Sequence, residues 1–237
     1  MRESRRTMAR RSSDSPPLPP RPARRAAPHP GPDFAREAAL LQNGVHCVAG
    51  VDEAGRGPLA GPVVAGAVIL RVEHIPEGLD DSKKLGARER ERLFDAILDM
   101  AEVGLGSASA AEIDRLNIRQ ATFLAMRRAL FALPSRPDHA LIDGRDVPPG
   151  LPCAGSAVIG GDALCLSIAA ASIVAKVMRD RLMTTLCASD PRYGFSRHMG
   201  YPTVAHRAAL AEHGVGPHHR RSFGPVRALM LAGESDG

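Results

Sequence analysis

The sequence of 237 residues predicts one α/β domain, a sheet with helices packed on its faces. Short apolar runs typical of buried strands alternate along the chain with longer segments of helical spacing, the order expected of such a fold. Hydrophobic residues form 44% of the chain, enough at this length for one sizeable core. About the last 35 residues contain no strand pattern, which favours a helical cap at the C-terminus.

The first half of the folded region holds three expected strands. A short helical stretch, 34–41, precedes the apolar run 45–51, which is typical of a buried strand. Residues 61–70 predict a second strand because they are rich in Val, Ala and Ile. Residues 87–100 have helical spacing, with apolar side chains on one side and charges on the other, and 102–107 predict the third strand.

The second half holds two short strands between two long helices. Residues 117–133 carry apolar side chains at helical spacing. The short apolar runs 140–142 and 157–159 predict two more strands, and a long helix-like segment, 164–186, follows them. The small residues at 169–172 would permit close packing of this last helix on the sheet.

Residues 1–32 differ from the rest of the chain in composition. They are rich in Arg, Pro, Ser and Ala and hold almost no aliphatic side chains, so they cannot bury enough apolar surface to offset the entropy of ordering. We expect a disordered basic arm there, a folded domain at 33–225 and a tail at 226–237. Eight arginines outweigh Glu3 and Asp14, which gives the arm a net charge of +6 and leaves −1 of the chain's +5 for the remainder. Net charge therefore does not identify a partner of the folded part.

Membrane and secretory classes are disfavoured by what the sequence lacks. No apolar run approaches the roughly 18 residues that cross a bilayer, and the N-terminus lacks the apolar segment of a secretory signal. The four cysteines form no CxxC pair, which argues against a disulfide framework or a structural zinc site. We expect a soluble cytoplasmic protein with reduced thiols and no membrane partner.

Acidic residues stand where predicted strands end. Asp52 and Glu53 follow the run 45–51, Asp143 closes the run 140–142, and Asp162 follows the last strand across two glycines. Polar groups at strand ends often carry the chemistry of an α/β sheet, and four carboxylates in one pocket would repel one another unless cations neutralised them. Mg²⁺ or Mn²⁺ suits such oxygen ligands. Taken singly, Asp143 and Asp162 are more readily explained as turn formers or helix caps, and only the combination indicates a metal site.

A glycine-rich turn at 55–61 follows the first two acidic residues. Neighbouring side chains on a regular strand face opposite ways, so we expect Gly55 to let the chain turn and bring Asp52 and Glu53 inward together. The glycine spacing does not fit a dinucleotide-binding fingerprint, because a strand follows the turn. Flanking glycines would permit close approach of a sugar-phosphate chain, and Arg56 would supply a phosphate or ribose contact. On spacing alone, however, a purely structural turn is favoured.

Five blocks of sequence resemble the ribonuclease HII family, in that family's order. The resemblance implies a ribonuclease H-like fold: a mixed five-stranded sheet flanked by helices, with a C-terminal helical cap. Arg145 and Gly160 depart from the residues common in the family, and neither is one of the carboxylates. The blocks are VAGVDEAGRGPLAGPVVAGAVIL (48–70), DDSKKL (80–85), LIDG (141–144), GGDALCLSIAAASIVAKVMRDR (160–181) and YGFSRHMGYPT (193–203).

The resemblance also implies roles for individual residues. Asp52, Glu53, Asp143 and Asp162 match the family's catalytic carboxylates, which hold two divalent ions, Mn²⁺ or Mg²⁺. Gly55, Arg56 and Gly57 match the motif that contacts the nucleotides around the cut and senses the 2′-hydroxyl. Tyr201 matches the tyrosine that stacks on the sugar at the junction of RNA and DNA, and Ser82, Lys83 and Lys84 match a segment near the nucleic acid. The basic residues Arg197, His198, His218, His219, Arg220 and Arg221 are further candidates to line the duplex.

The implied activity is that of a metal-dependent endonuclease of the ribonuclease H type. It would hydrolyse the phosphodiester 5′ of a ribonucleotide in RNA/DNA hybrids and in DNA duplexes with embedded ribonucleotides, by two-metal-ion catalysis that leaves a 3′-hydroxyl and a 5′-phosphate. We expect a monomer, with roles in replication and ribonucleotide excision repair. One alternative is a module of the same fold that binds hybrids without cutting them. Another is an enzyme that uses ATP or a nucleotide-sugar, disfavoured because no Walker motif is present.

Overall fold

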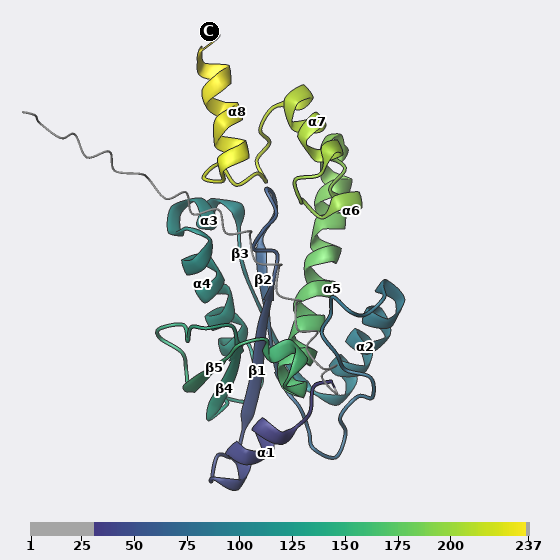
Figure 1. Cartoon of the computed structure of the whole chain (residues 1–237), viewed down its shortest axis with the longest axis vertical. Helices are drawn as coiled ribbons and strands as arrows, with labels where there is room; N and C mark the ends of the chain where they lie inside the picture. Colours follow the sequence, from purple (N-terminus) through teal and green to yellow (C-terminus); the bar gives the residue numbers. More distant parts are fainter. Residues whose placement is uncertain (1–30, 236–237) are drawn as a thin grey trace, which may run out of the picture.

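The computed structural model describes residues 31–235, so residues 1–30 of the expected basic arm lie outside the described residues. One five-stranded sheet runs through the middle of the molecule, with helices on both faces (Figure 1). Its strand order is β3-β2-β1-β4-β5, which puts β1 at the centre. The α/β class and the five strands are confirmed.

The sheet is mixed, as the resemblance implied. β1 pairs antiparallel with β2, and β2 with β3, whereas β1 pairs parallel with β4, and β4 with β5. The carboxyl ends of β1 and β4 therefore meet at the same edge, beside each other. The strands are β1 (Val48–Ala54), β2 (Val63–Ile69), β3 (Glu102–Ala108), β4 (His139–Asp143) and β5 (Ala154–Val158).

Helices cover both faces of this sheet. α4 packs on one face through a core with Ala49, Val51 and Val63, while α2 and α5 pack on the other face with Val68. Figure 1 shows α1 at one end of the sheet and the cap of α7 and α8 beyond the other. The helices are α1 (Ala35–Gln42), α2 (Ala87–Met100), α3 (Ala110–Leu116), α4 (Ile118–Phe131), α5 (Leu166–Ser189), α6 (Phe195–His198), α7 (Val204–His213) and α8 (Gly224–Ser235), with the 3₁₀ turns η1 (Gly161–Ala163) and η2 (Pro191–Tyr193).

α5 lies unusually close to the central strands, and glycines make this possible. A Cβ atom at Gly50 of β1 would collide with the α5 backbone at Ser167, and one at Gly66 of β2 would lie 2.7 Å from the carbonyl oxygen of Ala171. The small residues at 169–171 of α5 are fully buried against them. The close packing expected from the sequence is confirmed, and it brings the long helix next to the end of β1.

Several elements differ from the expectation, among them β1, β5 and α3. β1 begins and ends three residues later than the run 45–51, because residues as far as Ala54 keep their pairing with β2. β5 begins at Ala154 rather than Ala157; this edge strand is mostly exposed and lacks a clear apolar pattern. α3 was not expected, and Ser109 starts it with a capping box that closes on Glu112.

The C-terminal region is helical, as predicted, and it is attached to the rest of the fold. Residues 226–237, expected as a tail, continue α8 as far as Ser235. Val226 at the start of this segment is fully buried and packs with Leu59 and Leu210. No helix between residues 31 and 235 is long and apolar enough to cross a membrane.

Candidate active site

A cleft of about 270 Å³ opens at the carboxyl ends of β1 and β4. It brings together residues from β1, the glycine turn, the loop before α2, β4, α5 and the cap. Nine of the eleven residues predicted from the sequence line it, and Asp162 and Lys84 are the two that do not. The lining residues are Asp52, Glu53, Ala54, Gly55, Arg56, Gly57, Ser82, Lys83, Asp143, Lys176, Arg179 and Tyr201.

Asp52 and Glu53 reach the cleft from within β1, not from a turn after it. The pairing of Asp52 with Gly66 and of Glu53 with Ala65 keeps the strand regular there. Because side chains alternate along a strand, Asp52 lies on the face of α5 and Glu53 on the face of α4. The expectation that Gly55 turns both side chains to one side is wrong. The cleft instead wraps around the end of the strand between the two helical layers.

Asp143 and Asp162 lie beside them on neighbouring segments. Asp143 ends β4, and its carboxylate accepts a hydrogen bond of 2.7 Å from the N–H of Gly161. That bond ties the end of β4 to η1, which carries Asp162. Asp162 is buried and does not line the cleft, but it binds the ammonium of Lys83, which does.

The carboxylates raise one another's pKa. Burial raises the pKa of Asp52 well above its usual value, and the charges of Glu53 and Asp143 raise it further. Burial also raises the pKa of Glu53, although the Arg56 guanidinium, 3.2 Å away, lowers it in part. The pKa of Asp143 is raised by burial and by Asp162, against the hydrogen bond from Gly161. The protein has thus placed acidic groups where their ionised form is unfavourable without a cation.

Lys83 supplies one positive charge to this group. Its ammonium lies 2.8 Å from Asp162 and 3.5 Å from Asp81. Burial opposes its charged form, but the hydrogen bond and charge of Asp162 outweigh burial and raise its pKa. The lysine side chain is 75% exposed, so it is accessible from solvent.

The donor set fits a hard divalent cation. Between residues 31 and 235, no three His, Cys, Asp or Glu side chains converge closely enough to form a metal site by themselves. The cleft nevertheless offers carboxylate oxygens, which Mg²⁺ and Mn²⁺ prefer, and burial with the neighbouring acidic groups raises the pKa of Asp52 and of Asp143. A divalent cation would relieve the repulsion between the carboxylates. The single positive charge of Lys83 cannot balance four carboxylates.

The glycine turn and Tyr201 also line the cleft. Gly55 has φ +94, and a Cβ atom there would collide with the guanidinium of Arg179. A Cβ atom at Gly57 would lie 3.6 Å from the ring of Tyr201, so the turn and the ring are neighbours. Tyr201 is 47% exposed, which leaves its ring accessible to a ligand.

Two residues of the loop before α2 behave differently from Lys83. Ser82 is buried, and its N–H donates a hydrogen bond of 3.2 Å to the hydroxyl of Ser172 on α5. Lys84 pairs with Asp80 at 2.9 Å and does not line the cleft. Only Lys83 therefore presents a cation to the carboxylates from this loop.

Several basic residues expected to line a duplex are buried instead. His219 is 2% exposed and Arg220 is fully buried, so neither touches a ligand at the surface. Lys176 and Arg179, in contrast, line the cleft and were not predicted. No local pattern singled out Arg179, because Lys176, Asp180 and Arg181 surround it with other charged residues.

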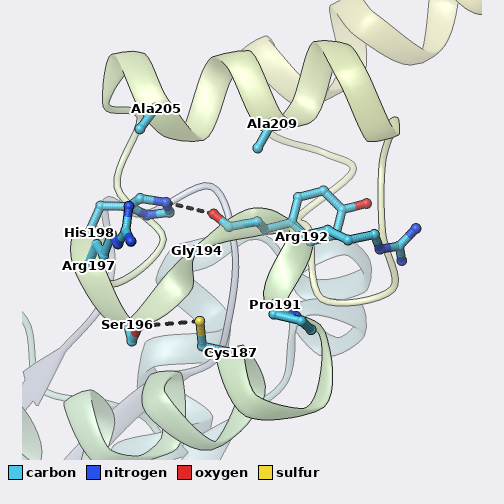
Figure 2. A pocket seen from close by; sticks show the side chains of 10 residues that line it. Cys187, Pro191, Arg192, Gly194, Ser196, Arg197, His198, Ala205 and Ala209 are labelled. Carbon is cyan, nitrogen blue, oxygen red and sulfur yellow. Dashed lines mark hydrogen bonds between the residues drawn. The ribbon is translucent and has the colours of Figure 1, made fainter.

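A second hollow lies in the cap, between the C-terminal end of α5 and α7 (Figure 2). It encloses about 410 Å³ and contains none of the eleven residues predicted to form the cleft, but Arg197 and His198, two of the basic residues expected to line a duplex, border it. Here the hydroxyl of Ser196 donates to the Sγ atom of Cys187 at 3.3 Å, and the Nε2 atom of His198 lies 2.9 Å from the carbonyl oxygen of Tyr193. These hydrogen bonds lie in the segment that precedes Tyr201 in the chain.

The comparisons with known proteins agree with this geometry. The family model described as ribonuclease HII matches residues 49–226. Ribonuclease HII of Magnetococcus marinus is 58% identical over 206 residues, which cover 85% of this chain and 97% of that protein. The crystal structure of ribonuclease H2 from Pyrococcus horikoshii OT3 superposes with a TM-score of 0.66 at 28% identity, covering 79% of this chain and 98% of that one.

A more distant structure shares the fold. Bst-RNase HIII, solved in complex with Mn²⁺, superposes with a TM-score of 0.66 at 20% identity and covers 83% of this chain and 73% of its own. The family match spans the sheet, the carboxylates, the glycine turn and the cap up to the start of α8. With its blocks, fold and close relatives in agreement, this chain belongs to the ribonuclease HII family.

Proposed function

We propose that this protein is a ribonuclease H endonuclease that cuts the phosphodiester 5′ of a ribonucleotide, in RNA/DNA hybrids and in DNA duplexes with embedded ribonucleotides. The observation that carries the proposal is that Asp52, Glu53 and Asp143 line one cleft together with the glycine turn and Tyr201. Membership of the ribonuclease HII family supports it. The products would carry a 3′-hydroxyl and a 5′-phosphate.

Asp52, Glu53, Asp143 and Asp162 would hold two divalent ions, Mg²⁺ or Mn²⁺. Such ions lower the pKa of a bound water and stabilise the charge on the attacking and leaving oxygens of a phosphodiester. The Mn²⁺ complex of the distant relative Bst-RNase HIII is in keeping with this choice of metal. No side chain in the cleft needs to act as a nucleophile.

The protein's own residues bind and orient the substrate. Lys83 and Arg56, both largely exposed, would contact phosphates and keep the duplex backbone against the carboxylates. The turn at Gly55–Gly57 allows close approach of a sugar, and Tyr201 would stack on the sugar at the junction of RNA and DNA. Since only the 2′-hydroxyl distinguishes a ribonucleotide within a DNA duplex, a tight contact at the turn would read it.

This activity predicts a cellular role. Ribonucleotides enter DNA during replication. An enzyme with this specificity would therefore act in replication and in ribonucleotide excision repair. We propose a monomer acting in the cytoplasm, because one cleft with all its residues from one chain is sufficient for the chemistry.

The test is cleavage of a DNA duplex that carries one ribonucleotide, beside an all-RNA hybrid, in Mg²⁺, in Mn²⁺ and in chelator. We expect metal-dependent cutting 5′ of the ribonucleotide. Asp143→Asn should lower the rate at least about a thousandfold while leaving the melting temperature within a few degrees. Binding of the duplex without cutting in any metal would instead support a hybrid-binding module, and cutting by Asp143→Asn at the normal rate would reject the site.

A further inference from the structure

Arg220 is the most deeply buried charged group next to the glycine turn. Its guanidinium donates three hydrogen bonds, all to backbone carbonyls of the turn at 55–61. Nε donates to the oxygen of Gly61 at 3.0 Å, Nη1 to that of Arg56 at 2.9 Å and Nη2 to that of Gly55 at 2.5 Å. No side-chain carboxylate within residues 31–235 accepts a hydrogen bond from it. All the hydrogen bonds of this guanidinium therefore go to the backbone of one loop.

Keeping a charge in this position is unfavourable in itself. Burial and the nearby guanidinium of Arg179 lower the pKa of Arg220 to about 9. A group with that pKa is still charged at neutral pH, so the unfavourable burial is not relieved by loss of a proton. A buried cation of this kind is retained where its hydrogen bonds fix something that an apolar side chain would leave loose.

The three contacts set the direction of two peptide groups. The chain has no cis peptide bond between residues 31 and 235, so the N–H of each peptide points opposite to its C=O. Because Arg220 holds the carbonyls of Gly55 and Arg56, the N–H groups of Arg56 and Gly57 point away from it. Neither N–H donates to an acceptor within the described residues, and both residues line the cleft.

The segment that carries Arg220 is itself fixed to the turn. The N–H of Arg220 donates to the oxygen of Leu59 at 2.8 Å, and that of Gly61 donates to the oxygen of His218 at 2.9 Å. Ala60 and His219 pair as an antiparallel bridge. The guanidinium therefore has no freedom to follow a turn that moves, and it holds the turn in one conformation.

We propose that Arg220 is a positioning residue for substrate binding: it holds the turn at Gly55–Gly57 so that two free N–H groups face the sugar-phosphate backbone. This rests on the proposed function, in which that turn contacts the nucleotides around the cut. Arg220 itself touches no substrate. Its effect is on how well the turn binds the duplex.

The experiment compares Arg220→Lys and Arg220→Gln with the wild-type chain on a duplex with one ribonucleotide. Lys keeps the charge without the fork of donors, and Gln keeps a donor without the charge. Arg136→Lys is the matched control, because Arg136 also donates to a backbone carbonyl, that of Pro152, at a distant surface. Steady-state kinetics, melting temperature and hydrogen–deuterium exchange of the peptide at 52–61 are measured for each.

We expect KM to rise about tenfold in both Arg220 variants, and exchange at 55–61 to increase while β1 stays protected. Arg136→Lys should change KM less than twofold. A variant that is only partly unfolded loses kcat and keeps KM, so a rise in KM separates positioning from simple loss of stability. The wild-type chain in the same assay tests the proposed function independently.

Three results would overturn the proposal. One is an unchanged KM in variants that fold. Another is a rise in KM as large for Arg136→Lys. The third is failure of both Arg220 variants to fold at 10 °C, which would make the residue a support of the whole fold rather than of the turn. If the wild-type chain binds the duplex but does not cut it, the dissociation constant replaces KM and the inference is still decided.

Discussion

At the scale of single residues, the acidic groups of the cleft destabilise the folded protein when they are ionised. Asp52 is buried beside Glu53 and Asp143, and burial with their charges raises its pKa. Elsewhere acidic residues are placed to be stabilised. Glu112, for example, accepts hydrogen bonds from Arg128 and Ser109, and its pKa falls to about 2. The contrast supports the proposal that the acidic charge of the cleft serves chemistry and not folding.

Asp52→Asn should therefore raise the melting temperature of the metal-free protein by a few degrees at pH 8. The raised pKa means that the ionised carboxyl destabilises the folded state, a penalty that is fully present above the folded-state pKa and disappears as the pH falls towards the unfolded-state value. The gain should accordingly vanish near pH 4. Differential scanning calorimetry in chelator checks this, with Asp95→Asn on the exposed side of α2 as control. A lower melting temperature for Asp52→Asn would contradict the electrostatic account.

The sequence identified the site residues by type and order but not by exposure. Asp52, Glu53 and Asp143 were predicted because several acidic residues follow predicted strands, and their combination indicated a metal site. Arg220 was misplaced because a run of histidines and arginines is typical of a solvated basic surface. Its burial depends on packing between the cap and the glycine turn, 159 positions away in the chain, which no local pattern encodes.

At the scale of elements, polar contacts fasten the helices to the sheet. Glu37 of α1 is buried, and its carboxylate accepts hydrogen bonds from the N–H of Ser167 at 2.9 Å and from its hydroxyl at 2.6 Å. Ser167 lies in the first turn of α5, where backbone N–H groups lack partners within the helix. One short helix thus caps the long helix that borders the cleft.

Glu37→Ala should destabilise the protein by about 2 kcal/mol, because it removes an acceptor from two buried donors. For a folded region of this size that corresponds to a fall in melting temperature of roughly 4–8 °C. Thermal unfolding followed by circular dichroism measures it, with the exposed neighbour changed in Arg36→Ala. A fall of less than one degree would show that water replaces the carboxylate without loss.

A chain of hydrogen bonds links α7 to the loop before α8. The N–H of Gly216 donates to Nδ1 of His219, which leaves Nε2 of His219 to donate to Nε2 of His206 at 3.0 Å. Nδ1 of His206 then donates to the carbonyl oxygen of Tyr201 at 2.9 Å. Both rings must be neutral for this order, and burial with the neighbouring His206 lowers the pKa of His219 to about 4.

The stability of the cap should consequently fall with acid. A histidine with a lowered folded-state pKa stabilises fully above about pH 6.5, and this contribution is lost as the pH falls towards 4, by up to about 3 kcal/mol. We expect the melting temperature to drop more between pH 7.5 and 5 for the wild-type chain than for His219→Gln. The exposed His74→Gln serves as control. Equal pH dependence in wild type and His219→Gln would refute the neutral pair.

Elements were predictable where one physical signal dominated. The helix expected at 87–100 matches α2 because its apolar stripe is complete. β1 was misplaced by three residues because acidic side chains do not look like strand residues, although pairing with β2 keeps them in the sheet. α3 was missed because it is short, and its only clear signal in the sequence is the capping pair of Ser109 and Glu112.

At the scale of the whole molecule, charge is divided unevenly along the chain. Residues 1–32 carry +6, whereas the remainder carries −1, so most of the net attraction to a polyanion comes from outside the described fold. Inside it, the cleft relies on a few cations such as Lys83, Arg56 and Lys176. We therefore expect residues 1–32 to provide most of the long-range attraction to a polyanion, and the cleft to provide the chemistry.

Removal of residues 1–32 should raise KM for duplex substrate severalfold at 50 mM salt and leave kcat unchanged. The difference should shrink as salt rises, because screening removes the same attraction. Kinetics across a salt series measure it, beside a full-length variant whose eight arm arginines are glutamine. Salt slopes that coincide for all three proteins would show that the arm does not meet the duplex.

The hydrogen bonds between the glycine turn and the segment at 216–220 join positions near the start of the fold to positions near its end. On the ribosome, the carboxylates of β1 therefore emerge long before the residues that fasten the turn beside them. A product of premature termination, or a chain clipped before residue 220, would keep all four carboxylates and lack the hydrogen bonds that hold the turn. An incomplete chain would therefore have the carboxylates but not the fixed glycine turn beside them, and we expect it to bind duplex poorly.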